Sequence, residues 1–558
     1  HLSQHVGGFI ISEEPITQLV PQENAAMKNR TIIQWDKDDL EALGLLKIDI
    51  LSLGMLTAIR KSIQYINNYY GTSLDISNIP PEDPQIYSML QKGDSLGVFQ
   101  VESRAQMAML PRLKPNNFYD LVIEVAIVRP GPIQGDMVHP YLKRRQGLED
   151  IEYPNKNVQN ILERTLGIPI FQEQVIKLAM VAAGFSGGEA DQLRRAMASW
   201  KSKGRLESFE KKIIEGMQKQ GHSREFAERL FKQIQGFGEY GFPESHAASF
   251  ALLVYISAWL KCHEPAAFYC GLLNSLPMGF YSPSQIIQDA KRHNISILDI
   301  DVQKSHWDHY LVPSGTDGSS PAGLRLGLRL VKGLSYKEAI RIERNQPFLD
   351  INDLSKRGNL KAQTLRFLSR AGAMKSLLGN RYQSYWEVAS VHSNTAIEKN
   401  ISKTKSKFLL PAPSASEDMI HDYQYLGLTL GPHPMKFLRT ANVFKNHHKA
   451  IDLHKCRNGE HIATVGIVTG RQRPSTAHGT LFLTLEDETG NINVVIKPKV
   501  LNKYRSIALQ AKLIRLKGIV EKKNEAIHFV PGYLEDITEV FIAILDNKAT
   551  PFKSRDFK

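Results

Sequence analysis

The alternation of apolar and polar residues changes its period within residues 44–62, which read GLLKIDILSLGMLTAIRKS. In the first half, Lys47 and Asp49 alternate with isoleucines, and a period of two is typical of a β-strand with one polar face. After Gly54 the apolar residues recur at helical intervals. The pattern therefore predicts a strand with a polar face, a tight turn and then a helix.

The side chains of Lys47 and Asp49 would share the polar face of that strand, and two interpretations fit. The pattern alone favours an ordinary Lys–Asp pair on a solvated face, because a buried unpaired charge is costly. The alternative is a metal-binding carboxylate beside a phosphate-binding lysine. The motifs further along the chain are needed to choose between these two interpretations.

Helical periodicity dominates from about residue 61 to residue 294, and it is clearest in Gln172–Ala183 and Arg224–Gln235. In this region three motifs combine special turns with basic or aromatic residues. They are VRPGP with Arg129, ADQLRRAM with Arg194 and Arg195, and GFGEYGFPESHAASF with Tyr240 and His246.

Each of these motifs suits a phosphate or a nucleotide, and each also has a purely structural interpretation. Prolines on both sides of a glycine would hold Arg129 on a rigid turn, where its guanidinium suits a phosphate. A basic helix could clamp a triphosphate, and Tyr240 offers a flat face to a base or sugar. The structural alternatives are an arginine that ties two helices together, an intrahelical ion pair and a packed polar histidine.

Short helices are predicted over residues 295–393, where Lys332-Gly333 leads into a helix at Tyr336–Asn345 and Gly372 lies in a second small unit. A glycine turn between short helices is typical of a helix-hairpin-helix, which presents backbone N–H groups to a phosphate. An ordinary helical hairpin fits the short motif equally well. Residues 394–445 are expected to be a linker, because their first part is rich in Ser, Lys, Thr, Pro and Ala.

Residues 446–540 carry five short segments with strand patterns, which predict a small barrel of the OB type, and residues 541–558 form a tail. Such barrels often bind single strands through basic and aromatic groups, for which Arg471, Arg473 and Phe482 are candidates. A barrel that only packs against its neighbours is the alternative. The predicted strands are Ile462–Arg471, Thr480–Asp487, Ile492–Ile496, Leu513–Val520 and Ile527–Tyr533.

The charge of the chain narrows the range of partners. The 558 residues carry a formal net charge of +13, which favours a polyanionic partner, nucleic acid first and a membrane surface second. A generally basic protein would have the same charge. No run of about 18 apolar residues exists, so no membrane span is expected. The three cysteines, Cys262, Cys270 and Cys456, have no metal-ligand spacing and fit a reducing cytoplasm.

The order and wording of the motifs resemble the C-family bacterial DNA polymerases, which are the alpha subunit of DNA polymerase III and its relatives. The resemblance runs in register over nearly the whole chain and rests on KIDILSLGMLTAI, GVFQVES, VRPGPIQGDMV, IFQEQV, ADQLRRAM and YGFPESHAASFAL. Within the family, the chain resembles the error-prone polymerases more than the main replicase. The replicase typically has Asn-Lys where this chain has Pro243-Glu244, and this chain also ends soon after the barrel.

The resemblance implies an α+β multidomain fold. Its expected parts are the C-terminal part of a palm (1–60), mainly helical fingers (61–294), a region with tandem helix-hairpin-helix motifs (295–393), the linker, and the OB barrel followed by its tail. The implied function is part of an error-prone, translesion DNA-directed DNA polymerase. Such an enzyme serves DNA replication and repair after DNA damage, and it adds deoxynucleotides to a primer 3′ end by two-metal nucleotidyl transfer with Mg²⁺.

The resemblance also implies roles for single residues. Asp49 matches the third metal carboxylate, and Lys47 matches the basic residue that faces the triphosphate. The nucleotide-binding surface is matched by Arg129, Arg194, Arg195, Tyr240 and His246. The expected DNA-binding residues are Lys332, Gly333, Gly372, Arg471, Arg473 and Phe482.

The implied partners are primer-template DNA and deoxynucleoside triphosphates, with the sliding clamp and damage-response proteins as further candidates and no membrane. The expected location is the bacterial cytoplasm, at the nucleoid. The family's other two metal carboxylates, its PHP domain and its thumb are expected upstream of His1. We therefore expect this chain by itself to bind DNA without polymerising. The competing interpretations are a non-catalytic DNA-binding remnant and a fragment of the replicative alpha subunit.

Overall fold

The computed structural model describes most of the chain. The described residues are 8–24, 31–33, 35, 37–49, 52–127, 135–198, 205–237, 243–279, 281–313, 322–391, 409–440, 444, 446–473, 479–523, 526–544 and 555–557. Among them, no helix has both the length and the apolar character that crossing a membrane requires.

The N-terminal part contains the predicted strand, turn and helix. Strand β4 (Leu46–Asp49) pairs antiparallel with β1 (Gly8–Ile11), with Ile10 opposite Lys47 and Gly8 opposite Asp49. Helix α2 (Leu53–Tyr70) begins four residues after β4 ends, as the change of period predicted. Nearby lie a second pair of strands, β2 (Gln22–Asn24) and β3 (Thr31–Ile33), and the short helix α1 (Lys37–Ala42).

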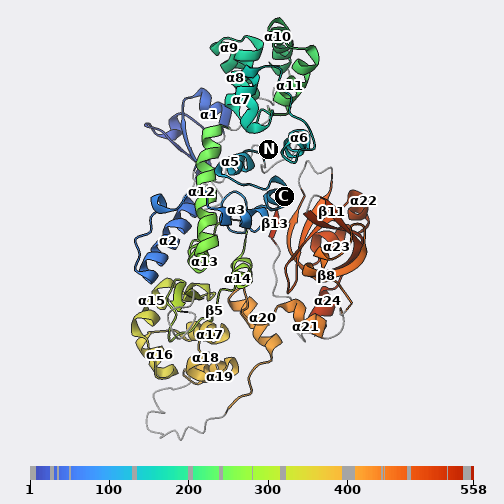
Figure 1. The fold of residues 1–558 in the computed structure, drawn as a ribbon. Coiled ribbons are helices and arrows are strands. Elements are labelled where there is room, and N and C mark those ends of the chain that lie inside the picture. Colours follow the sequence, from blue (N-terminus) through green and yellow to red (C-terminus); the bar gives the residue numbers. More distant parts are fainter. Residues whose placement is uncertain are drawn as a thin grey trace, which may run out of the picture.

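The fingers region is helical, as expected, and it is built around α12 (Glu244–His263). Figure 1 shows α12 in the middle of this region, with α7 to α11 beyond its N-terminal end and α13 and α14 beyond its C-terminal end. The other helices are α3 (Pro84–Gln91), α4 (Arg104–Leu113), α5 (Phe118–Ile127), α6 (Gly135–Arg145), α7 (Lys156–Leu162), α8 (Gln172–Ala183), α9 (Gly187–Ala198), α10 (Arg205–Lys219), α11 (Arg224–Phe237), α13 (Pro265–Leu273) and α14 (Pro283–Arg292).

Small residues let α12 approach its neighbours closely. Ala247, Ala251, Val254 and Ala258, at spacings of four, three and four, are all fully buried. This stripe repeats at helical intervals, so it forms one continuous face that packs against α5, α3 and α2. The helix ends before Pro265, which starts α13, a position where proline is well tolerated.

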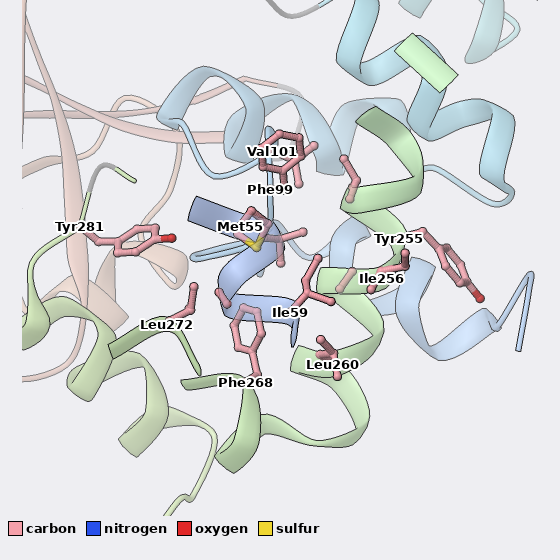
Figure 2. Close-up of a cluster of buried hydrophobic side chains, with 14 of the residues drawn as sticks. Met55, Ile59, Phe99, Val101, Tyr255, Ile256, Leu260, Phe268, Leu272 and Tyr281 are labelled. Atoms are coloured by element: carbon pink, nitrogen blue, oxygen red, sulfur yellow. The ribbon is translucent and has the colours of Figure 1, made fainter. Parts of the chain in front are cut away.

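The largest buried cluster joins α2, α12 and α13 (Figure 2). Met55 and Ile59 of α2 face Phe268 and Leu272 of α13, and Ile256 of α12 lies beside them. Gly271 of α13 lies at the closest approach to α2. A Cβ there would lie 2.1 Å from the Ser62 hydroxyl and 2.7 Å from the Ala58 carbonyl oxygen.

The region after the fingers shares the same core, because its buried residues belong to the cluster that contains α12. The predicted glycine turns are present: Gly333 has a φ of +87° and Gly372 a φ of +74°. A Cβ on Gly333 would lie 2.4 Å from the Phe367 ring, so this turn requires glycine. The elements are β5 (Ile297–Leu298), β6 (Tyr310–Pro313), β7 (Ala322–Arg325), α15 (Tyr336–Asn345), α16 (Ile351–Arg357), α17 (Ala362–Arg370), α18 (Lys375–Leu378) and α19 (Arg381–Val391).

The stretch expected to be a linker contains helices. Within 394–445, α20 (Ala415–Tyr425) and α21 (Pro434–Thr440) pack on the barrel, where Met435 is buried in one cluster with Val465 and Leu513. Residues 394–408 lie outside the described residues. The Ser- and Lys-rich composition that suggested a linker stops near the start of α20, which is why composition did not reveal these helices.

The C-terminal region is the predicted barrel. The five strands follow the order β11-β12-β10-β9-β8, and β11 also pairs with β8, which closes the barrel. The strands are β8 (His461–Gln472), β9 (Leu481–Glu486), β10 (Asn491–Ile496), β11 (Leu513–Lys523) and β12 (Ala526–Asp536). The remaining elements are α22 (Pro498–Lys503), α23 (Arg505–Gln510), α24 (Thr538–Ile544) and β13 (Arg555–Phe557), which pairs with β8.

The contact between α13 and α2 gives a first prediction. Gly271→Ala should destabilise the chain by about 1–3 kcal/mol, because the added methyl meets the Ala58 backbone and overpacking of a core costs that much. Gly188→Ala in α9 is the matched control, since a Cβ there meets nothing within 4 Å. The control should gain up to about 1 kcal/mol from helix propensity. Urea unfolding followed by circular dichroism measures both, and equal stability of the two variants would contradict the packing described.

Candidate functional site

The elements that carry the predicted nucleotide site are attached to one scaffold. Strand β4 leads into α2, and α2 packs on α12, which carries His246 in its first turn. Helix α9 contains positions 194 and 195 and packs on α8, which contacts the N-terminus of α12 through Glu173. Packing contacts therefore connect α2, which follows β4 in the chain, and α8, which carries α9, with α12.

The described residues cover the predicted site in part. The backbone is described at Lys47, Asp49, Arg194 and Arg195, and their side chains lie outside the described part of the structure. Residues 128–134 with Arg129 and residues 238–242 with Tyr240 also lie outside the described residues. Their roles stay predictions.

His246 is exposed in the first turn of α12, and its position is fixed by aromatic neighbours. The centre of its ring lies 4.3 Å from that of Phe250, one helical turn later. Phe250 in turn packs edge-on against Phe99 of the GVFQVES motif, with ring centres 5.4 Å apart. The packed rings of Phe250 and Phe99 therefore hold the His246 imidazole in place at the surface.

Glu244, at the start of α12, is held by three neighbours. Its carboxylate accepts a hydrogen bond from the Tyr119 phenol at 2.8 Å and lies 3.7 Å from the guanidinium of Arg164. Its backbone N–H donates to the carboxylate of Glu173 at 3.0 Å, so the IFQEQV motif caps this helix. Burial and the nearby Glu244 carboxylate raise the pKa of Tyr119, which keeps the phenol a donor. Position 244 therefore carries a carboxylate that is already bound by Tyr119 and Arg164. A lysine at this position, as expected for a replicase, would instead offer a positive charge.

The other end of α12 carries a buried ion network. The ammonium of Lys261 is buried and lies 2.6 Å from Asp94 and 2.9 Å from Asp289 of α14. His293 lies 2.7 Å from Asp94, and the Tyr269 phenol donates to Asp289 at 2.7 Å. Burial acts to raise the pKa of Asp94, but His293 and Lys261 outweigh it and hold the pKa below its usual range. Lys261 and Arg292, whose guanidinium lies 3.0 Å from Asp289, balance the charges of the two carboxylates, so this cluster has a structural role.

The GVFQVES motif is a tightly packed turn against α12 and α13. The backbone N–H of Phe99 donates to the Ser257 hydroxyl at 3.1 Å. Gly97 has a φ of +79°, and a Cβ there would lie 2.6 Å from Leu272. Glu102 has a buried carboxylate oxygen with Tyr281 nearby, and burial raises the pKa of this carboxyl to about 7. The GVFQVES motif therefore has a packing role, because it supports α12, the helix that carries His246.

Lys332, predicted to bind DNA, is bound to the protein. Its ammonium donates to the carbonyl oxygens of Tyr423 and Gln424, at 3.0 and 2.6 Å, near the end of α20. Helices end with unpaired carbonyl oxygens, and a lysine is a suitable cap for them. In this structure its charge ties the hairpin region to α20, which the sequence did not reveal because the two lie about 90 residues apart.

Arg471 does not face solvent, contrary to the prediction that it binds DNA. It is 5% exposed, its Nε donates to the Ala508 carbonyl oxygen at 3.0 Å, and its guanidinium also reaches Ala511. It therefore holds the end of α23 against the barrel. Arg473 is exposed just after β8, and Phe482 is half-buried opposite Gln472 on the outer side of β9. These positions suit contact with a single strand.

Comparisons with known proteins agree with this arrangement. Residues 55–221 match the family described as "Bacterial DNA polymerase III alpha subunit finger domain", and residues 1–52 match "Bacterial DNA polymerase III alpha NTPase domain". Residues 294–384 match a helix-hairpin-helix motif, and residues 462–537 match an "OB-fold nucleic acid binding domain".

Curated relatives match over the whole chain. The chain is 53% identical over 560 residues to the error-prone DNA polymerase of Alkalilimnicola ehrlichii, covering 100% of the chain and 54% of the relative. It is 52% identical over 577 residues to that of Methylococcus capsulatus and 51% over 568 residues to that of Pseudomonas aeruginosa, with the same coverage in both. The chain thus spans about half the length of the curated relatives it matches.

The buried carboxyl of Glu102 predicts a pH-dependent stability. In the folded protein the pKa of this carboxyl is about 7, above the ordinary value of 4.5. The contribution of the neutral carboxyl to stability is therefore fully present below pH 4.5 and is lost as the pH rises through 7. Glu102→Gln should remove this loss. Relative to the wild type, the variant should gain up to about 3 kcal/mol between pH 4.5 and pH 8.

Urea unfolding at several pH values measures the gain of the Glu102 variant. Glu152→Gln, at an exposed glutamate, is the control and should follow the wild type at every pH. A constant difference between Glu102→Gln and the wild type across this range would refute the buried-acid interpretation.

Proposed function

The chain belongs to the C-family of bacterial DNA polymerases, on the branch of the error-prone enzymes, and from this premise we propose that it is the palm-to-barrel part of an error-prone DNA-directed DNA polymerase. The observation that carries the proposal is about 52% identity over the entire chain to proteins named for this activity. The reaction would be nucleotidyl transfer to a primer 3′ end. The engaged Glu244 supports the error-prone branch, because the replicase-like lysine is absent there.

The donor set fits Mg²⁺ only in part. The carboxylate of Asp49 is a hard oxygen ligand of the kind this ion prefers, but a hard cation is usually shared among several such ligands. The described cluster of Asp94 and Asp289 is not a substitute, since Lys261 and Arg292 already neutralise it. We therefore propose that Asp49 shares the ion with palm carboxylates of a longer polypeptide. When bound, divalent ions in such sites activate the attacking hydroxyl and stabilise the leaving group.

The remaining side chains would bind and orient the substrates. We assign the triphosphate to Lys47, Arg194 and Arg195, and the rest of the nucleotide surface to Arg129, Tyr240 and His246. Cationic side chains suit the triphosphate, and the exposed imidazole of His246 is held in place by the Phe250 ring. The exposed glycine turn at Gly333 would follow the duplex backbone, with the charge of +13 adding sequence-independent attraction. Gly372, also predicted to bind DNA, is buried, and its N–H donates to the Ser369 carbonyl oxygen at 3.0 Å, so it is not available to a phosphate.

The setting of the enzyme follows from the same proposal. The substrates would be primer-template DNA and deoxynucleoside triphosphates in the bacterial cytoplasm, at the nucleoid. The sliding clamp and damage-response proteins are the proposed accessory partners. The second candidate function is DNA binding without catalysis, and the lone Asp49 carboxylate favours it for a polypeptide of residues 1–558 alone.

Primer extension separates these two functions. A polypeptide of residues 1–558 should bind primer-template DNA with an affinity that falls steeply with salt, and it should extend no primer. A longer polypeptide that adds the N-terminal part of the polymerase should extend it. In that longer protein Asp49→Asn should lower kcat by about 10³-fold or more, because the metal loses a charged ligand.

The control for Asp49→Asn is Asp150→Asn, at an exposed aspartate in the fingers, which should keep full activity. Extension by residues 1–558 alone, or full activity of the Asp49 variant, would overturn the assignment of Asp49 as a shared metal ligand.

The barrel gives an independent prediction about single-stranded DNA. Arg473→Ala and Phe482→Ala should weaken binding of single-stranded DNA by roughly 5- to 100-fold, the effect of losing stacking or charge at one nucleotide. Arg471→Ala should instead destabilise the barrel by about 1–3 kcal/mol, because two carbonyl oxygens lose their donor. Fluorescence anisotropy and thermal unfolding measure the two effects. Weaker DNA binding by Arg471→Ala at unchanged stability would reverse the roles assigned here.

A further inference from the structure

The segment that leads into the barrel brings together three side chains of metal-ligating types. One ligand atom each of His448, Cys456 and Glu460 lies within 4.8 Å of the others. His448 precedes the 3-10 helix η6 (Ala450–His454), Cys456 follows it, and Glu460 immediately precedes β8. The spacings of eight and four residues across a short 3-10 helix and the turns after it form no recognisable motif, so the sequence did not predict this cluster.

The backbone around these side chains is fixed by the barrel. The N–H of His448 donates to the Ala463 carbonyl oxygen at 2.8 Å, and its own carbonyl oxygen accepts from the Thr464 hydroxyl at 2.9 Å. The carbonyl oxygen of Glu460 accepts from the N–H of Val520 at 3.0 Å. The cluster is thus held in place by β8 and β11, and it is pre-organised in the way that a binding site requires.

The imidazole of His448 has an unsatisfied atom. Its Nδ1 is buried and has no hydrogen-bond partner in the part of the chain that the structure describes. A buried polar atom without a partner is costly, and it is a reason to look for a missing ligand. The thiol of Cys456 donates to the Asp452 carbonyl oxygen at 3.5 Å, a weak hydrogen bond that a metal ion could replace.

The donor types select the ion. An imidazole nitrogen, a thiolate and a carboxylate are the ligands of Zn²⁺ and similar borderline ions, whereas Mg²⁺ requires oxygen ligands throughout. A thiolate and a carboxylate also neutralise the two charges of the ion. Lys522, a cation near Cys456, is held by the His454 carbonyl oxygen at 2.7 Å, so its ammonium has another partner.

We propose that His448, Cys456 and Glu460 bind one Zn²⁺ ion, which links the segment before the barrel to its first strand. On binding, the Cys456 thiol gives its proton to solvent and the thiolate sulfur donates to the metal. With three protein ligands, water completes a tetrahedral site. The ion would stabilise the barrel against unfolding, since it binds the folded site and not the separated ligands. This proposal is independent of the polymerase function.

Metal titration of the full 558-residue chain tests the proposal after a chelator has removed all metal. Zn²⁺ should bind with one high-affinity site per chain, and Co²⁺ should give visible bands of a tetrahedral site with a sulfur-to-metal charge-transfer band. Cys456→Ser, which is nearly isosteric, should lose that band. His448→Gln and Glu460→Gln should each lower the Zn²⁺ affinity more than about 100-fold, because even supporting residues of metal sites cost 10- to 100-fold.

Matched controls come from the same chain. His454→Gln removes an exposed histidine of the same segment, and Cys262→Ser removes a cysteine of α12; both should bind Zn²⁺ as the wild type does. Zn²⁺ should raise the melting temperature of the wild type and not that of Cys456→Ser. A Co²⁺ spectrum without the sulfur band, or unchanged Zn²⁺ affinity of Cys456→Ser, would show adventitious binding and overturn the proposal.

Discussion

The burial of α12 is the constraint on which the rest of the fingers depends. Its stripe of small residues, from Ala247 to Ala258, is fully buried, and α2, α3 and α5 pack around it. A helix whose inner face packs against three others can move only if its neighbours move with it. The strand that carries Asp49 precedes α2 in the chain, and α2 packs on α12, which carries His246.

The two ends of α12 are fixed by different interactions. At its start, the carboxylate of Glu173 accepts the backbone N–H of Glu244, and the Tyr119 phenol and Arg164 hold the Glu244 side chain. At its end, the buried ammonium of Lys261 joins α12 to Asp94 and to Asp289 of α14. Removing one partner of such a buried pair leaves an uncompensated charge. The network therefore stabilises the fold only when all of its charged partners are present.

Much of the fold was predictable because local pattern and tertiary packing agree. Period-two alternation located β4 and the barrel strands, and helical spacing located α8 and α15. The side-chain contacts that the sequence did not reveal share a different cause. Lys332 and Arg471 both cap helix ends that lie far away in the sequence, and no local pattern reports where a long cationic side chain finds its carbonyl oxygen. The cluster at Cys456 was missed because a short 3-10 helix followed by turns sets its spacing, and this combination has no sequence signature.

The most direct test is a cryo-electron microscopy structure of a longer polypeptide containing these 558 residues, bound to primer-template DNA and a non-hydrolysable deoxynucleoside triphosphate. Our interpretation predicts the primer 3′ end and a metal ion beside Asp49, with the triphosphate facing α9 and the first turn of α12. The duplex should follow the exposed turn at Gly333. DNA bound only by the barrel, with the primer end away from β4, would contradict the assignment of this chain to catalysis.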